Sequence, residues 1–337
     1  MRSGSDPGLD VIDFVYRSMN IDEQWSERNE RGFTCWGHRL AQQVWAEAPR
    51  LSQGYWVTRV HARAAVLREV PWSGAIQARV SALNMYGSLS AYCREADGRR
   101  LSLDCNVYVH HGNAAWLKRL FACAVALQAA EAEIAADMLS SLVGGAPDES
   151  GHPINGPRVV PDNMLDIIAQ LFAPASAGPS ACKPGEFEQA LAMAPEPWVL
   201  ASGDEQGLTA EFPFTDSTPA VAGGRGTALL IASAAEQHPR LGSGLLVRLA
   251  LPVLVDALRG NELAHQLNWV EATQWNAPHF LGAWCLDANS TLTFVTFVPS
   301  AVYAPGLLHA LILSSAVRAR WAGEYIADLR ARPTSVG

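Results

Sequence analysis

Few residues in this chain combine a type and a spacing that suit catalysis or metal binding. His110 and His111 end a predicted strand just before a predicted helix N-terminus, where an anion or a metal ion can bind. Adjacent strand residues point to opposite faces, and no Asp, Glu or Cys stands at ligand spacing. We interpret both as surface imidazoles beside a helix cap. An acid–base pair divided between distant loops stays hidden in a single sequence.

The remaining chemical motifs are incomplete. Residues 223–226 (GGRG) resemble a phosphate-binding loop, but the Lys-Ser/Thr ending is missing. The sequence contains neither GxSxG nor HExxH. Its six cysteines lie far apart and form no CxxC pair, so the common zinc motifs are excluded. We therefore predict no catalytic residue, no metal and no cofactor.

Composition and charge set the class of protein. The 337 residues are 49% hydrophobic and 17% charged, which is typical of a globular chain long enough for two domains. A net charge of −8 argues against nucleic acid or an anionic membrane surface as the main partner. No apolar run approaches the ~18 residues of a membrane helix, and the first residues lack the apolar core of a signal peptide. We expect a cytoplasmic protein without membrane insertion.

One stretch of the sequence occurs twice. Residues 89–97 (LSAYCREAD) return as residues 281–289 (LGAWCLDAN), with Leu, Ala, Cys and Ala in register. Upstream, PRLSQG at 49–54 returns as PRLGSG at 239–244. The predicted fold class is therefore α+β, with two tandem copies of an antiparallel sheet covered by helices and packed as a pseudo-dimer.

The predicted elements follow the same order in both copies. Residues 101–109 alternate in polarity after an Asp97-Gly98 turn, and a long amphipathic helix follows them. In the second copy, residues 253–267 suit a helix and residues 269–275 a strand. The predicted boundaries are a first domain at 9–143, a linker at 144–161 and a second domain at 162–329. That domain opens with a helix at 162–172 and has an insertion at about 173–197.

The alternation in each hairpin assigns side chains to a dry and a wet face. Cys93 and its equivalent Cys285 are assigned to the dry face, and Tyr92 and its equivalent Trp284 to the other. Residues 292–298 (LTFVTFV) of the second copy are apolar on both faces. That outer face must be covered by the first copy, by a partner or within its own domain.

The outward aromatics are the candidates for a contact surface, because Trp and Tyr are enriched at interface hot spots. Residues 55–66 alternate as a strand with Arg59 and His61 on its polar face. The predicted partner-binding residues are Tyr92, Trp284, Tyr86, Tyr108, Arg59 and His61. Most of the eleven tryptophans are expected in the core.

Each copy is predicted to contain a helix, several antiparallel strands, a second helix, a hairpin beginning LxAxC, and a long closing helix. This arrangement resembles the type III secretion chaperone-like fold, which the YbjN family also has. The resemblance is carried by residues 89–138 and again by residues 281–289, 292–299 and 305–327. It implies a non-enzymatic protein that binds segments of other proteins, often as a dimer, so a tandem copy resembles a covalent pseudo-dimer.

Three hypotheses follow. The first is a protein-binding module without a cofactor, which holds a partner protein segment on a sheet face or edge. The second is a ligand-binding protein or an enzyme, with Arg59, His61 and His110 lining a cleft between the copies. The third is a structural subunit of a larger assembly. The sequence names neither the partner nor the oligomeric state.

Overall fold

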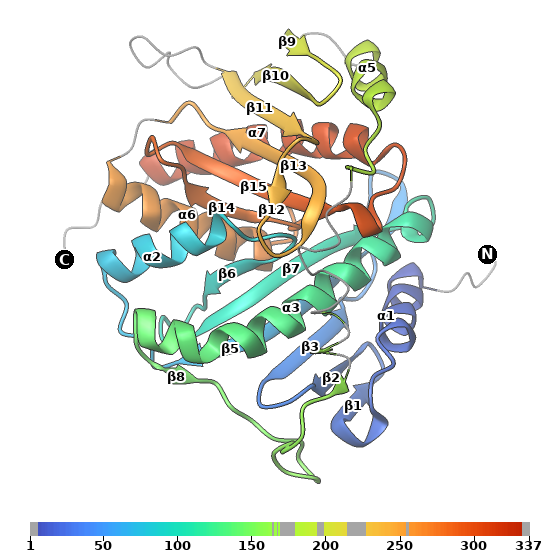
Figure 1. Cartoon of the computed structure of the whole chain (residues 1–337), viewed down its shortest axis with the longest axis vertical. Coiled ribbons are helices and arrows are strands. Elements are labelled where there is room, and N and C mark those ends of the chain that lie inside the picture. The colour runs from blue at the N-terminus through green and yellow to red at the C-terminus, as the bar shows by residue number, and fades with distance from the viewer. Residues whose placement is uncertain are drawn as a thin grey trace.

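Two antiparallel sheets, each covered by helices, make up this α+β protein (Figure 1). The computed structural model describes residues 6–163, 165–166, 168, 179–193, 199–213, 227–253 and 256–331. Within these residues the α-helices are α1 (Pro7–Ser18), α2 (Gly74–Asn84), α3 (Ala114–Val143), α5 (Pro184–Ala192), α6 (Ala257–Thr273) and α7 (Leu307–Ala331). Short 3-10 turns occur at Glu23–Trp25 and Ser300–Val302. The predicted fold class is confirmed.

The first sheet belongs to the first copy. Its strands lie in the order β1 (Ser26–Asn29), β2 (Gly32–Trp36), β3 (Ala41–Ala46), β5 (Tyr55–Arg68), β7 (Leu101–Val109) and β6 (Ala91–Arg94). Two short strands, β4 (Arg50–Ser52) and β8 (Ala146–Pro147), also pair with β5.

The second sheet repeats this order. Its strands are β9 (Val199–Gly203), β10 (Gly207–Pro213), β11 (Thr227–Ser233), β13 (Gly242–Ala250), β15 (Leu292–Pro299) and β14 (Ala283–Leu286), and β12 (Gln237–His238) pairs with β13. The path β2-β3-β5-β7-β6 therefore corresponds to β10-β11-β13-β15-β14. The duplication seen in the sequence extends to the topology of the chain.

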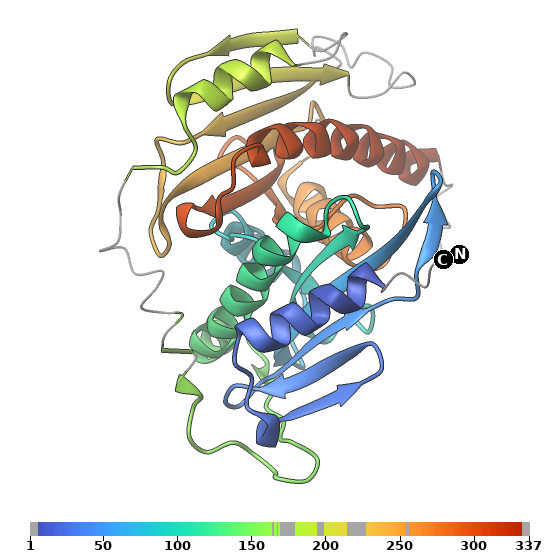
Figure 2. The same ribbon diagram turned by 90° about the vertical axis from the view of Figure 1, so that its right-hand side faces the viewer.

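Long helices cover one face of each sheet. Figure 2 shows α1 and α3 along the first sheet and α7 along the second. Helix α5 packs on α7 as α1 packs on α3, so α5 takes the place of α1 although it lies within the expected insertion at 173–197. The helix expected at 162–172 falls mostly outside the described residues. The strand expected at 269–275 is wrong, because α6 continues to Thr273.

The two copies meet through equivalent elements. Helix α2 packs on α6 and on β14, while α6 packs on β6. Asn106 and Phe280 exchange backbone hydrogen bonds of 3.0 and 2.9 Å. In the reverse direction, Phe297 donates its backbone N–H to Ser88 O at 3.3 Å. Each copy therefore offers the same patch to the other, as in a two-fold dimer.

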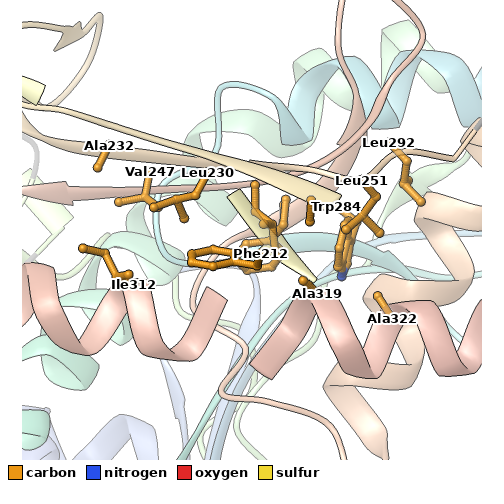
Figure 3. Close-up of a cluster of buried hydrophobic side chains, with 14 of the residues drawn as sticks. Phe212, Leu230, Ala232, Val247, Leu251, Trp284, Leu292, Ile312, Ala319 and Ala322 are labelled. Carbon is orange, nitrogen blue, oxygen red and sulfur yellow. The ribbon is translucent and has the colours of Figure 1, made fainter. Parts of the chain in front are cut away.

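The strand register reverses the predicted faces of both LxAxC strands. Tyr92 lies directly opposite Leu103, and Trp284 opposite Phe294, and antiparallel residues that lie opposite share a face. Tyr92 therefore packs toward α3 and is 4% exposed, while Trp284 packs toward α7 and is 0% exposed. Figure 3 shows Trp284 above α7 in a cluster of buried apolar side chains. Its expected exposure, and that of Tyr92, are wrong.

The opposite face of each sheet is buried as well, between the copies. In β7, the polar residues of the alternating pattern at 101–109 include Ser102, Asp104 and Asn106, and all three are buried. In β15, Val295 and Phe297 pack with Met85 of the first copy, so the doubly apolar strand is covered by the other copy. Both faces of these strands are buried, so the alternation of polar and apolar residues could not identify a solvent-exposed face.

A matched pair of asparagines fixes the buried aromatics. Asn84, at the end of α2, accepts a hydrogen bond from Tyr92 N at 2.8 Å and donates one to Tyr92 O at 3.1 Å. Asn268 in α6 makes the same two bonds to Trp284, at 2.7 and 2.9 Å. The second helix of each copy is therefore tied to its LxAxC strand by one amide side chain.

Candidate functional site

Three of the six predicted site residues lie together at the junction of the copies. Arg59 pairs across the ladder with Tyr108, and His61 pairs with Asn106. The alternation of β5 puts Arg59 and His61 on the face opposite α3, as predicted. That face is covered by the second copy rather than open to solvent.

Arg59 is a fully buried cation. Its guanidinium donates to the Glu271 backbone O at 2.6 Å, and Asn106 Nδ2 donates to the same oxygen at 2.9 Å. Its Nη1 lies 3.8 Å from Glu47 Oε1, and its Cζ lies 5.5 Å from the Tyr108 ring centre. Burial lowers the pKa of Arg59, and Glu47 opposes that shift. The contacts place a cation at the C-terminal end of α6, where the helix dipole favours it.

The buried imidazole of His61 pairs with the half-buried carboxylate of Glu47. Its Nε2 lies 2.8 Å from Glu47 Oε1, and its ring stacks on Trp45 at 4.7 Å. Burial lowers the pKa of His61, whereas the hydrogen bond to His61 lowers the pKa of Glu47. A catalytic dyad also needs a nucleophile or a substrate proton within reach. His61 is 5% exposed, and its described neighbours Trp45, Arg59 and Asn106 supply no nucleophile.

Glu271, whose backbone O accepts the hydrogen bond from Arg59, also forms a buried ion pair with Arg318 through its side chain. Glu271, fully buried in α6, accepts hydrogen bonds from Trp284 Nε1 at 2.8 Å and from Arg318 Nε at 3.1 Å. The Arg318 guanidinium lies 3.7 Å from the Phe294 ring centre. Burial raises the pKa of Glu271, and the nearby Arg318 opposes that shift. These bonds join α6, β14 and α7 and serve packing.

Arg59 and His61 are buried where the two copies meet. Two cavities lined by described residues lie elsewhere: one of about 1180 Å³ is lined by residues 18–22 and 157–163 among others, and one of about 350 Å³ lies beside β10 and β11. Arg59, His61 and His110 line neither. Within the described residues, no group of three or more His, Cys, Asp or Glu is arranged to hold a metal ion.

The predicted site residues also include one exposed aromatic. Tyr86 follows α2 and is exposed, and its backbone O lies 2.7 Å from His238 Nε2 of the second copy. Tyr108 is half-buried, with its hydroxyl donating to the Trp275 backbone O. The six candidates thus divide into buried core, buried junction and one surface residue, and they form no common surface.

Sequence reasoning missed a different surface. At the tip of the β4–β5 hairpin, Leu51, Tyr55 and Trp56 are 64, 66 and 61% exposed. Leu51 lies directly opposite Trp56, so their side chains share a face. We call Arg50, Leu51, Tyr55 and Trp56 the hairpin patch. Neighbouring large apolar side chains that stay exposed mark interaction sites, and the repeated PRLxxG turn was the available signal.

Comparison with protein-family models, curated proteins and solved structures finds no match to this chain. Among the described residues, no helix is both long and apolar enough to span a bilayer. The site must therefore be interpreted from its own geometry.

Proposed function

We propose that this protein is a non-enzymatic protein-binding module in which two chaperone-like copies are fused as a pseudo-dimer. The hairpin patch is the observation that carries the proposal. It exposes Leu51 and Trp56 on one face of the hairpin and Arg50 and Tyr55 on the other, and Trp, Tyr and Arg dominate binding energy at protein interfaces. The resemblance to secretion chaperones, which hold segments of other proteins, supports the same class.

The geometry favours binding through side-chain anchors over strand addition at the first sheet. Its outer edge, β1, has the sequence SERN and exposes three of four residues. Short, charged edge strands resist pairing with another chain. The opposite edge, β6, lies against α6 and β14 at the junction. The hairpin patch extends away from both edges, at the right-hand side of Figure 2.

The expected compartment is the cytoplasm. All six cysteines are free and buried, and unpaired thiols are typical of proteins kept in a reducing environment. Burial raises the pKa of Cys105 and of Cys285 to about 12, so neither thiol is a reactive thiolate at neutral pH.

In-cell photo-crosslinking tests the proposal. A benzophenone amino acid replaces Trp56 in one variant and Val317 in the other, because Val317 of α7 is 62% exposed and also apolar. We expect a discrete protein adduct from position 56 and none from position 317. The same adducts from both positions, or none from position 56, would refute a binding role for the hairpin patch.

A further inference from the structure

Three histidines of the second copy hydrogen-bond to backbone atoms of the first copy. They lie in β12, in α6 and in the loop before β14, and they reach α2, the residues after α2, and β7. The contacts are His238 Nε2 to Tyr86 O at 2.7 Å, His265 Nε2 to Gln77 O at 3.0 Å, and Tyr108 N to His279 Nδ1 at 2.9 Å. We call His238, His265 and His279 the junction histidines, because each connects one copy to the other.

The geometry of all three contacts requires an unprotonated Nδ1. The Nδ1 of His238 accepts from Arg240 N at 3.2 Å, and the Nδ1 of His279 accepts from Tyr108 N. The Nδ1 of His265 is buried and has no hydrogen-bond partner among the described residues. A doubly protonated imidazole can only donate. Protonation therefore breaks two hydrogen bonds and adds one buried N–H without an acceptor.

The charged groups that face the junction histidines are mostly cations. They are Arg94 for His265, Arg318 and His110 for His279, and Arg240 and Glu131 for His238. Glu131, the one carboxylate among them, is itself paired with Arg240 at 3.2 Å and accepts from Tyr92 Oη at 2.9 Å. A protonated imidazole would therefore meet like charge at most of these positions.

Burial keeps the junction histidines neutral while the copies are in contact. It lowers the pKa of His238, and it lowers the pKa of His265 to about 4. Burial and the nearby Arg318 lower the pKa of His279 to about 4, although its ring is partly exposed and its share is smaller. An imidazole in water has a pKa of about 6.5. Separated copies therefore bind more protons, and the contact weakens as the pH falls from about 6.5 towards 4.

We propose that the junction is an acid-sensitive switch, in which protonation of the junction histidines separates the two copies and uncovers the apolar face of β13 and β15. That face carries Leu246, Val295 and Phe297, which pack with Met85 of the first copy in the closed state. An apolar sheet face that becomes exposed is a binding surface for apolar segments. Acid therefore controls access to this surface.

The cores under the helices should survive the separation. In the first copy, Leu103 and Leu139 belong to a cluster formed by that copy alone, between its sheet and α3. Another buried imidazole, His61, does not act across the junction, because its Nε2 lies 2.8 Å from Glu47 of its own copy. Opening of the junction and unfolding of a copy are therefore separate events.

An acid titration of the full-length protein tests the proposal. The binding of an anilinonaphthalene sulfonate dye, the radius of gyration from X-ray scattering, and the far-UV circular dichroism are followed from about pH 7.5 to about pH 4. We expect dye binding and radius to rise together while the far-UV signal stays constant. The steepness of the transition should correspond to an uptake of two to three protons, and to about one fewer in His265→Gln.

Two variants make the test specific. The double variant H238Q/H265Q should open at a pH lower by roughly one unit, because glutamine still donates to the two carbonyl groups but takes up no proton. His111→Gln changes an exposed imidazole and should behave as wild type. If the double variant does not fold at neutral pH, the proton uptake of H265Q decides alone.

Three results would overturn the inference. Loss of the far-UV signal together with dye binding would mean that acid unfolds the whole chain. A transition of unchanged midpoint and steepness in the histidine variants would assign the opening to other groups. A shift in H111Q as large as that in H265Q would show that net charge, and not the junction, controls the transition.

Discussion

The two copies bury equivalent sheet faces against each other, but the chemistry of those faces differs. On β5 and β7 the face carries Arg59, His61 and Asn106, whereas on β13 and β15 it carries Leu246 and Phe297. In a homodimer one patch must be complementary to itself. Two copies in one chain are free of that constraint, so one face can be polar while the other is apolar.

The difference matters for stability. Apolar burial is tolerant of exact geometry, whereas every buried charge needs a partner. In the polar half, Arg59 Nε and Nη1 make no hydrogen bond, which is a cost that the apolar half does not carry. The polar half therefore depends on exact geometry more than the apolar half does.

The largest expected effect comes from breaking the buried Glu271–Arg318 pair. Arg318→Met leaves a buried carboxylate without its cation and should reduce the free energy of unfolding by about 3 to 5 kcal/mol. Urea unfolding measures the loss. The control is Arg28→Met, which breaks an exposed pair with Asp13 and should cost about 0 to 1 kcal/mol. Equal losses in the two variants would mean that the Glu271–Arg318 pair is not desolvated.

At one matched position, only the second copy carries a titratable side chain. Three residues before the matched asparagines, α2 carries Ser81 and α6 carries His265, whose Nε2 lies 3.0 Å from Gln77 O. Burial lowers the pKa of His265 to about 4. Its folded form therefore stays neutral while the unfolded form takes up a proton below about pH 6.5. Stability should fall between pH 6.5 and pH 4 by about 2 to 3 kcal/mol from this group.

The measurement compares wild type with His265→Gln by urea unfolding at several pH values. The variant should lose less stability than wild type over that range. Glu271, whose pKa is raised by burial, acts in the opposite direction in both proteins and cancels in the difference. Parallel curves for the two proteins would show that His265 is protonated in the folded state.

The matched asparagines test how far the two copies remain equivalent. Asn84→Ala and Asn268→Ala each leave one backbone N–H and one C=O of a buried strand unpaired. Each should cost about 1 to 3 kcal/mol in unfolding free energy. Because the two amides make the same bonds, the losses should agree within about 0.5 kcal/mol. Unequal losses of unfolding free energy would show that the surroundings of the two asparagines at the junction contribute differently to stability.

The sequence predicted the duplication and the α+β class because the repeated LxAxC strand and its turn are local features. It also contained the correct faces. A turn at Asp97-Gly98 puts Tyr92 opposite Leu103, so the two side chains share a face. The alternation within each strand, taken separately, does not give this register. The burial of the second face depends on the other copy, which no local pattern contains. The hairpin patch was missed for the same reason, since its exposure depends on how far β5 extends past that copy.

The smallest effect on stability is expected where the copies differ most in exposure. Leu51→Ser changes an exposed leucine and should alter the unfolding free energy by less than about 0.5 kcal/mol. Leu241→Ser, at the same position of the PRLxxG sequence repeat but in the turn between β12 and β13, removes a contact with the first copy and should cost about 1 to 2 kcal/mol. Urea unfolding of both variants measures the two losses of unfolding free energy. A small loss in L51S is what the proposed binding role predicts, whereas a large loss would assign the leucine a structural role instead.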